Sequence, residues 1–239
     1  MKKIYNYLIG ALVATGMLCS CSNFDDLNTN PDSPTTVTPE MLATKLILGT
    51  TKPSTSKAFF NSNFLMKQLA WGEGSVDYQY NKMGRSGFGG YTSLVNGVKM
   101  VELADDNNPN AFQALNKFVK AFTVFYISME MGDVPYSDAL QGETGNITPK
   151  YDSQKDVMLQ ILDDLEEAYT LFGQAKKFDG DPVFGGDVNK WQKTVASFEL
   201  KVLMNLSRVA DDADLKVKER FATIVSNKKL MESCLLYTS

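Results

Sequence analysis

The sequence predicts an all-α protein of stacked helical hairpins with some long loops. Apolar residues recur at intervals of three and four across residues 111–131 and 191–209, which is the period of a helix packed on one side. Glycine, proline and clustered polar residues separate such stretches, and no strict repeat length appears. Binding chemistry is then expected in the loops, because the apolar faces of the helices form the core.

Composition bounds the class of protein. The chain has 239 residues, 44% of them hydrophobic and 22% charged, which suits a globular protein with a sizeable core. The formal net charge is −4 and no run of lysine and arginine stands out, which argues against nucleic acid as a partner. The sequence contains no histidine, so histidine-based triads, general bases and metal ligands are excluded.

Residues 1–20 have the pattern of a bacterial export signal, with a positively charged start and an apolar run too short for a permanent membrane span. The signal ends as Leu18-Cys19-Ser20-Cys21, which fits a lipobox. Cys21 is then the mature N-terminus and carries acyl chains such as palmitate, which anchor it in membrane lipid. Cys19 fits less well, because Leu18 would precede it where a small residue is needed. The alternative is an ordinary signal peptide.

Residues 21–38 form a flexible tether that is rich in Asn, Asp, Ser, Thr and Pro. Its acidic and amide residues imitate the start of a calcium loop, but Pro31 stands where glycine is required and Val37 where glutamate is required. We therefore expect no metal site and no cofactor.

Two helices are predicted next. Thr38-Pro39-Glu40 supplies the cap, the first-position proline and the first-turn acid of a helix that runs to about Gly49. The second helix runs from about Ser56 to Ala70, with Leu69 among its inward residues.

Residues 71–91 form a long loop that mixes aromatic residues with glycine, a composition that a helix does not tolerate. Aromatic faces beside amide, carboxylate and guanidinium groups are what a sugar-binding surface needs. The candidate ligand contacts are Trp71, Asp77, Tyr78, Tyr80, Asn81 and Arg85. The alternative is a loop folded back onto the helices as core, which we favour for Phe88 and Tyr91.

Two further helices are predicted over about 91–106 and 111–131. Apolar residues on most sides of the second predict a central, buried position. Gly132 and a following proline end it, and Ser153 opens the next helix with Asp156 as its capping partner. From local physics alone, this joint connects two helices and does nothing more.

The helix over 153–172 carries its carboxylates mostly opposite its apolar residues, so we interpret them as a solvated face and expect no catalytic residues there. A loop rich in glycine and aspartate follows. Asp187 then caps a strong helix that runs to about Val209, and Trp191 is predicted to be a core residue. A last helix covers about 214–226.

Four motifs together resemble one family. They are Asn28-Thr29-Asn30-Pro31, Gly132-Asp133-Val134-Pro135-Tyr136-Ser137-Asp138-Ala139-Leu140, Pro149-Lys150-Tyr151-Asp152-Ser153-Gln154 and Gly186-Asp187-Val188-Asn189-Lys190-Trp191. In this order after a lipobox cysteine, they closely resemble the SusD/RagB family of nutrient-binding outer-membrane lipoproteins of Bacteroidetes. The resemblance covers about residues 18–226 and implies a fold of tetratricopeptide-like hairpins.

The resemblance also implies a function. Family members bind nutrients, mostly glycans, at the cell surface without catalysis. They form a lid over a SusC-like TonB-dependent outer-membrane transporter, to which they deliver the oligosaccharide. Their binding residues vary too much to be carried over by position. The acidic pair Asp25 and Asp26 resembles the surface-export signal of such lipoproteins, or is simply part of a solvated tether.

The expected SusD-like domain is 39–232. The resemblance implies that it lacks a C-terminal half, because family members continue for about as much sequence again. Residues 233–239 look like a translated sequencing adapter, so we expect a non-native tail there, with a genuine C-terminus as the alternative.

Three other functions stay open: a surface lipoprotein glycosidase, a purely structural lid subunit of the transporter, and peptide binding in place of glycan binding. A glycosidase needs two carboxylates, for which Glu73 and Asp77 are the only candidates in the aromatic loop.

Overall fold

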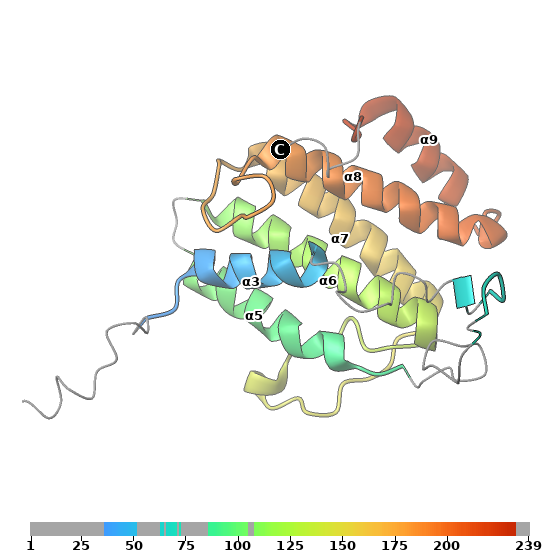
Figure 1. The fold of residues 1–239 in the computed structure, drawn as a ribbon, viewed down its shortest axis with the longest axis horizontal. Coiled ribbons are helices and arrows are strands. Elements are labelled where there is room, and N and C mark those ends of the chain that lie inside the picture. The colour runs from blue at the N-terminus through green and yellow to red at the C-terminus, as the bar shows by residue number, and fades with distance from the viewer. Residues whose placement is uncertain are drawn as a thin grey trace, which may run out of the picture. The chain divides into compact units, whose positions relative to one another are not determined.

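The computed structural model describes residues 36–51, 63–64, 66–70, 72, 86–104 and 108–232. This part of the chain contains helices and no strand, which confirms the predicted all-α class (Figure 1). Its α-helices are α3 (Pro39–Thr51), α5 (Gly89–Leu103), α6 (Pro109–Met131), α7 (Gln154–Gln174), α8 (Val188–Asn205) and α9 (Val217–Asn227). Two short 3₁₀ helices are η3 (Gly142–Thr144) and η4 (Leu206–Val209).

Helix α6 is central and largely buried, as its apolar residues predicted. It packs against α3, α5, α7 and α8, and consecutive helices from α5 to α9 lie side by side (Figure 1). The rings of Phe118 and Phe125 on α6 meet Phe198 on α8 edge to face, with centroids 5.9 and 5.6 Å apart, an arrangement that stabilises aromatic cores. None of the helices in the described part of the chain is long and apolar enough to cross a membrane.

Side-chain caps begin α7 and α8 at the predicted residues. Ser153 accepts a hydrogen bond from the backbone N–H of Asp156 (3.2 Å) and donates its hydroxyl to the carboxylate of the same residue (2.6 Å). Asp187 accepts from the N–H groups of Asn189 and Lys190 at 2.9 and 3.3 Å. These bonds satisfy N–H groups that have no partner within the helix.

Asp181 holds the loop before α8 against the first turn of that helix. Trp191 is buried, as predicted, and its indole N–H donates to the Asp181 carboxylate (2.7 Å). The same carboxylate accepts from the backbone N–H groups of Val183, Phe184 and Gly186 at 2.9, 3.2 and 3.0 Å. One buried side chain therefore satisfies four donors.

A buried ion pair attaches the end of α9 to the stack. Lys228 donates to Glu199 on α8 (2.8 Å) and to Glu166 on α7 (2.5 Å). Glu199 is only 1% exposed. Burial raises the pKa of the Glu199 carboxyl, and the hydrogen bond from Lys228 only partly offsets this effect.

The predicted helix over 56–70 is wrong at its end, and most of it lies outside the described residues. Residues 66–70 form a turn and a bend followed by irregular chain. Lys67 has a φ of 60°, which does not continue a right-handed helix. Leu69, which was expected to point inward, is 47% exposed.

Two helix ends also differ from the predictions. Helix α5 ends at Leu103, three residues early. Helix α8 gives way to the 3₁₀ turn of η4, and Val209, which was predicted to point inward, is 46% exposed. A 3₁₀ turn advances side chains by a larger angle per residue than an α-helix, so the apolar period no longer points to the core.

Candidate functional site

Residues 132–153 form the joint between α6 and α7, and two carboxylates organise it. Asp133 accepts from the backbone N–H of Gln154 (2.8 Å), the first residue of α7, which has no partner within the helix. Gly132 ends α6 with φ +85° and ψ −118°. Its φ is positive, but its ψ lies outside the left-handed helical region, in a conformation that glycine alone adopts readily.

Asp152 binds the two halves of the joint together. It lies opposite Val134 in an isolated antiparallel bridge, and its N–H donates to the Val134 carbonyl (3.1 Å). Its carboxylate, in a residue only 9% exposed, accepts from the backbone N–H groups of Tyr136 (3.0 Å) and Ser137 (2.7 Å) and from the Ser137 hydroxyl (2.9 Å). Two of the four motifs, those over residues 132–140 and 149–154, are therefore bonded to each other within one loop.

The surroundings of Asp152 favour its ionised form. Burial acts to raise the pKa of this carboxyl, but the hydrogen bonds from Ser137 and Tyr136, together with the charge of Lys150, outweigh burial and hold the pKa below its ordinary value of 3.8. A carboxyl with a lowered pKa stabilises the fold above its ordinary pKa. That contribution is lost as the pH falls through the lowered value.

Replacing Asp152 by asparagine should lower the free energy of unfolding at pH 7 by about 2–3 kcal/mol, because an amide has one acceptor oxygen and turns an N–H toward donors. The difference from wild type should begin to shrink as the pH falls below about 4, where the unfolded chain takes up a proton, and should go on shrinking as the pH falls through the lowered pKa of the folded carboxyl. Urea unfolding between pH 7 and pH 3 checks both statements.

Asp138→Asn is the matched control for Asp152→Asn, because Asp138 accepts one long hydrogen bond, from the N–H of Lys150 at 3.4 Å. It should change stability by less than about 0.5 kcal/mol. A loss in Asp152→Asn that stays constant from pH 7 to pH 3 would contradict the role of the charge.

Tyr136 anchors the joint in the core. The residue is 1% exposed, and its hydroxyl donates to Asp164 on α7 (2.6 Å), which also pairs with Lys117 (2.8 Å). Burial, and next the charge of Asp164, raise the pKa of the Tyr136 hydroxyl well above its ordinary value. Asp164 is therefore a structural partner, and the interpretation of all the α7 carboxylates as a solvated face is wrong for this residue.

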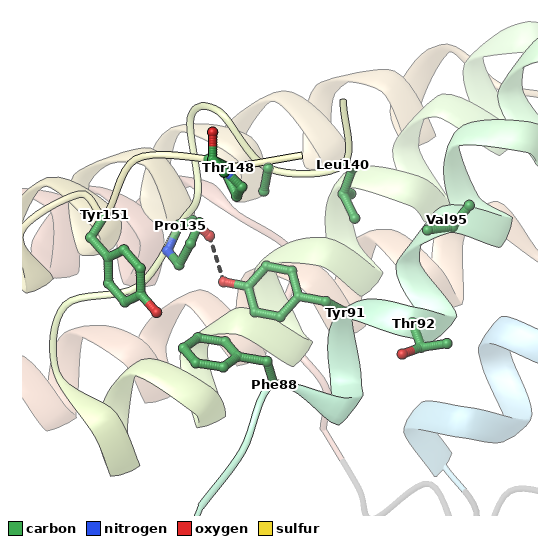
Figure 2. A pocket seen from close by; sticks show the side chains of 10 residues that line it. Phe88, Tyr91, Thr92, Val95, Pro135, Leu140, Thr148 and Tyr151 are labelled. Carbon is green, nitrogen blue, oxygen red and sulfur yellow. Dashed lines mark hydrogen bonds between the residues drawn. The ribbon is translucent and has the colours of Figure 1, made fainter. Parts of the chain in front are cut away.

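An open hollow of about 730 Å³ lies between the start of α5 and the joint (Figure 2). Its described lining consists of Phe88, Tyr91, Thr92, Val95, Pro135, Ala139, Leu140, Thr148, Pro149 and Tyr151. None of these side chains is charged and three are aromatic. A hollow of this size, mostly apolar with a few hydroxyl groups, has the character of a small-molecule site.

Three aromatic rings line one part of the hollow. The rings of Phe88 and Tyr151 meet edge to face, with centroids 6.0 Å apart, and the centroids of the Phe88 and Tyr91 rings are 5.8 Å apart. The Tyr91 hydroxyl donates to the carbonyl of Pro135 (2.5 Å), as Figure 2 shows, and so joins α5 to the joint. Burial, with smaller effects of Tyr151 and Asp152, raises the pKa of Tyr91 to about 12, so its hydroxyl keeps its proton at neutral pH.

The ligand contacts predicted from the sequence lie outside the described residues, and so does the lipidation site Cys21. These contacts are Trp71, Asp77, Tyr78, Tyr80, Asn81 and Arg85, and they stay predictions. Along the chain, only Ser86 and Gly87 separate Arg85 from Phe88, which lines the hollow. In the described part of the chain, no three potential metal ligands come together.

Sequence reasoning missed most of the hollow. Phe88 was interpreted as core, but it is 37% exposed and lines the hollow, whereas Tyr91 packs on the core and faces the hollow as well. Tyr151 was not considered, although it is 60% exposed. The sequence carried a signal for Tyr151. Side chains alternate between the two sides of an extended segment, so the side chain of Tyr151 points away from the side to which its neighbour Asp152 points.

The fold and the hollow define a helical protein with a ligand-sized site, and comparison with known proteins gives its family. Residues 31–235 match the SusD-like family that is described as starch-binding and associating with the outer membrane. The chain belongs to this family, which confirms the resemblance of its motifs.

Solved structures agree with this assignment. A SusD homologue from Bacteroides fragilis is 59% identical, with a TM-score of 0.78 over 82% of this chain and 42% of its own. A second SusD homologue from that species is 34% identical, with a TM-score of 0.70 over 83% of this chain and 42% of its own. A Bacteroides vulgatus outer membrane protein, whose description links it to nutrient binding, is 31% identical. Its TM-score is 0.71 over 83% of this chain and 43% of its own. The chain thus spans less than half of each. No curated protein sequence matches it significantly.

Proposed function

We propose that this protein captures glycan nutrients at the outer membrane, without altering them chemically, and passes them to a SusC-like TonB-dependent transporter. One observation carries the proposal: a member of a family described as starch-binding has an open, uncharged hollow lined by Phe88, Tyr91 and Tyr151. The acyl chains on Cys21 would hold the protein at the membrane. Incorporation of labelled palmitate into wild type and its absence from Cys21→Ala would support that anchor.

Aromatic rings and hydroxyl groups are together suited to a sugar. The C–H face of a pyranose packs on an aromatic ring, while its hydroxyl groups bond to polar groups or remain in water. Phe88 and Tyr151 meet edge to face, and Tyr151 is largely exposed, so part of its side chain is accessible to a ligand. We further propose that the aromatic loop, through Trp71, Tyr78 and Tyr80 with Asp77, Asn81 and Arg85, contributes to the same binding surface.

Alanine in place of Phe88 or Tyr151 should each weaken glycan binding about five- to thirtyfold, because each removes an aromatic contact worth about 1–2 kcal/mol. Calorimetric titration of the full-length gene product against neutral oligosaccharides checks this prediction. Tyr126→Ala is the matched control: Tyr126 is 38% exposed but lies on α6, bonded to Lys201 of α8, and is not among the residues that line the hollow.

The same titration separates the alternatives. If Trp71→Ala, Tyr78→Ala and Tyr80→Ala combined leave binding unchanged while Tyr151→Ala abolishes it, the loop is not part of the site. New reducing ends in the incubated glycan would indicate a glycosidase. Binding of peptides in place of every glycan, or uptake that all these variants leave unchanged, would contradict the proposal in favour of a peptide receptor or a structural lid.

A further inference from the structure

The hollow has two chemically different sides. In the view of Figure 2, Phe88 and Tyr151 lie on one side of Tyr91, and Leu140 and Val95 lie on its other side. Aromatic rings offer a flat face on which the C–H face of a sugar ring packs, whereas aliphatic side chains offer no such face. The aliphatic side therefore needs a different part of a ligand.

The aliphatic side offers few partners for hydroxyl groups. Among the described residues that line the hollow, hydroxyl groups come from two threonines and two tyrosines, and Tyr91 has already donated its proton to Pro135. The side chains of Val95 and Leu140 themselves offer a sugar hydroxyl no hydrogen-bond partner. A methyl group in the same place would lose only unfavourable hydration.

Leu140 supports this view through its backbone. Its φ is +66°, in the left-handed region that residues with a bulky side chain rarely adopt. Glycine or asparagine would fit this turn position with less strain. A leucine kept in such a conformation, half-buried on the core and facing the hollow, points to a role of its side chain there.

We propose that the aliphatic side of the hollow receives a methyl group that projects from a neutral glycan. The methyl is either C6 of a 6-deoxy sugar or the methyl of an O-acetyl ester. The absence of charged side chains from the described lining fits a neutral ligand. This inference rests on the proposed function and names the class of glycan that the site prefers.

Paired ligands, of which one member bears the methyl group and the other does not, test the inference. The first pair is O-acetylated xylo-oligosaccharide and the same material after alkaline deacetylation. The second is L-fucose and L-galactose, which differ only at C6. In calorimetric or NMR titrations of the full-length protein, the methyl-bearing member of at least one pair should bind about three- to tenfold more tightly, and that pair identifies the source of the methyl.

Leu140→Asn should remove the preference by weakening binding of the methyl-bearing ligand more than binding of the methyl-free ligand, because asparagine tolerates a positive φ but is polar. Val95→Thr replaces the side chain by one of nearly the same shape and should also reduce the preference for the methyl-bearing ligand. It replaces Leu140→Asn in the test if that variant is poorly folded. Equal binding within both pairs, or a preference that survives both variants, would overturn the inference while the proposed function stands. No binding of any glycan would overturn the proposed function itself.

Discussion

Replacing Asp181 by alanine should lower the free energy of unfolding by about 4 kcal/mol, one of the largest losses expected of any single change in the described chain. Four donors would lose their shared acceptor, including the buried indole N–H of Trp191. Each buried donor without a partner costs about 1–3 kcal/mol, and partial relaxation of the loop reduces the sum. Chemical denaturation followed by circular dichroism measures the loss.

Asp179→Ala is the control for Asp181→Ala, because Asp179 lies in the same loop but is exposed. It should change stability by less than about 0.5 kcal/mol. Asp181→Asn should give an intermediate loss, because one amide oxygen can accept only part of the four bonds. Similar losses for Asp179→Ala and Asp181→Ala would mean that the loop as a whole, and not this carboxylate, is sensitive.

Alanine at Gly186 should lower the free energy of unfolding by at least about 3 kcal/mol. Gly186 has φ +80°, and a Cβ there would overlap the carbonyl oxygen of Phe178 and lie 2.8 Å from its carbonyl carbon. The obstacle is backbone, so a rotamer change cannot relieve it, and the loop must move away from α8. Thermal and urea unfolding of the purified variant measure the loss.

Gly185→Ala separates the two contributions at this turn. Gly185 also has a positive φ, +61°, but a Cβ there would meet nothing within 4 Å. It should therefore lose only about 1 kcal/mol, from backbone strain. Equal losses in the two alanine variants would show that strain alone, without the overlap with Phe178, explains the effect.

The helices were predictable because their signals are local. Ser153 and Asp187 carry caps that act within one turn, and the apolar period of 111–131 identified α6 as central before any contact was known. The error at Leu69 has the opposite origin. An apolar period continued through residues 66–70, but the backbone turns at Lys67.

The candidate site was only partly predictable, because its residues meet through long-range contacts. No local pattern shows that Tyr91 bonds to Pro135, 44 residues later, or that Asp152 accepts bonds from Ser137. The sequence did mark the joint as unusual, through the motifs that it carries. It did not show that the same loop would form one side of a hollow.

The bonds of Asp152 and Tyr91 have a consequence for the thermodynamics of capture. They hold the backbone of the joint in place before any ligand arrives, so binding does not have to order this wall. The loss of conformational entropy then falls mainly on exposed side chains such as Tyr151. A preorganised wall with weak individual contacts favours rapid association and rapid release, which suits the proposed transfer of a ligand to a transporter.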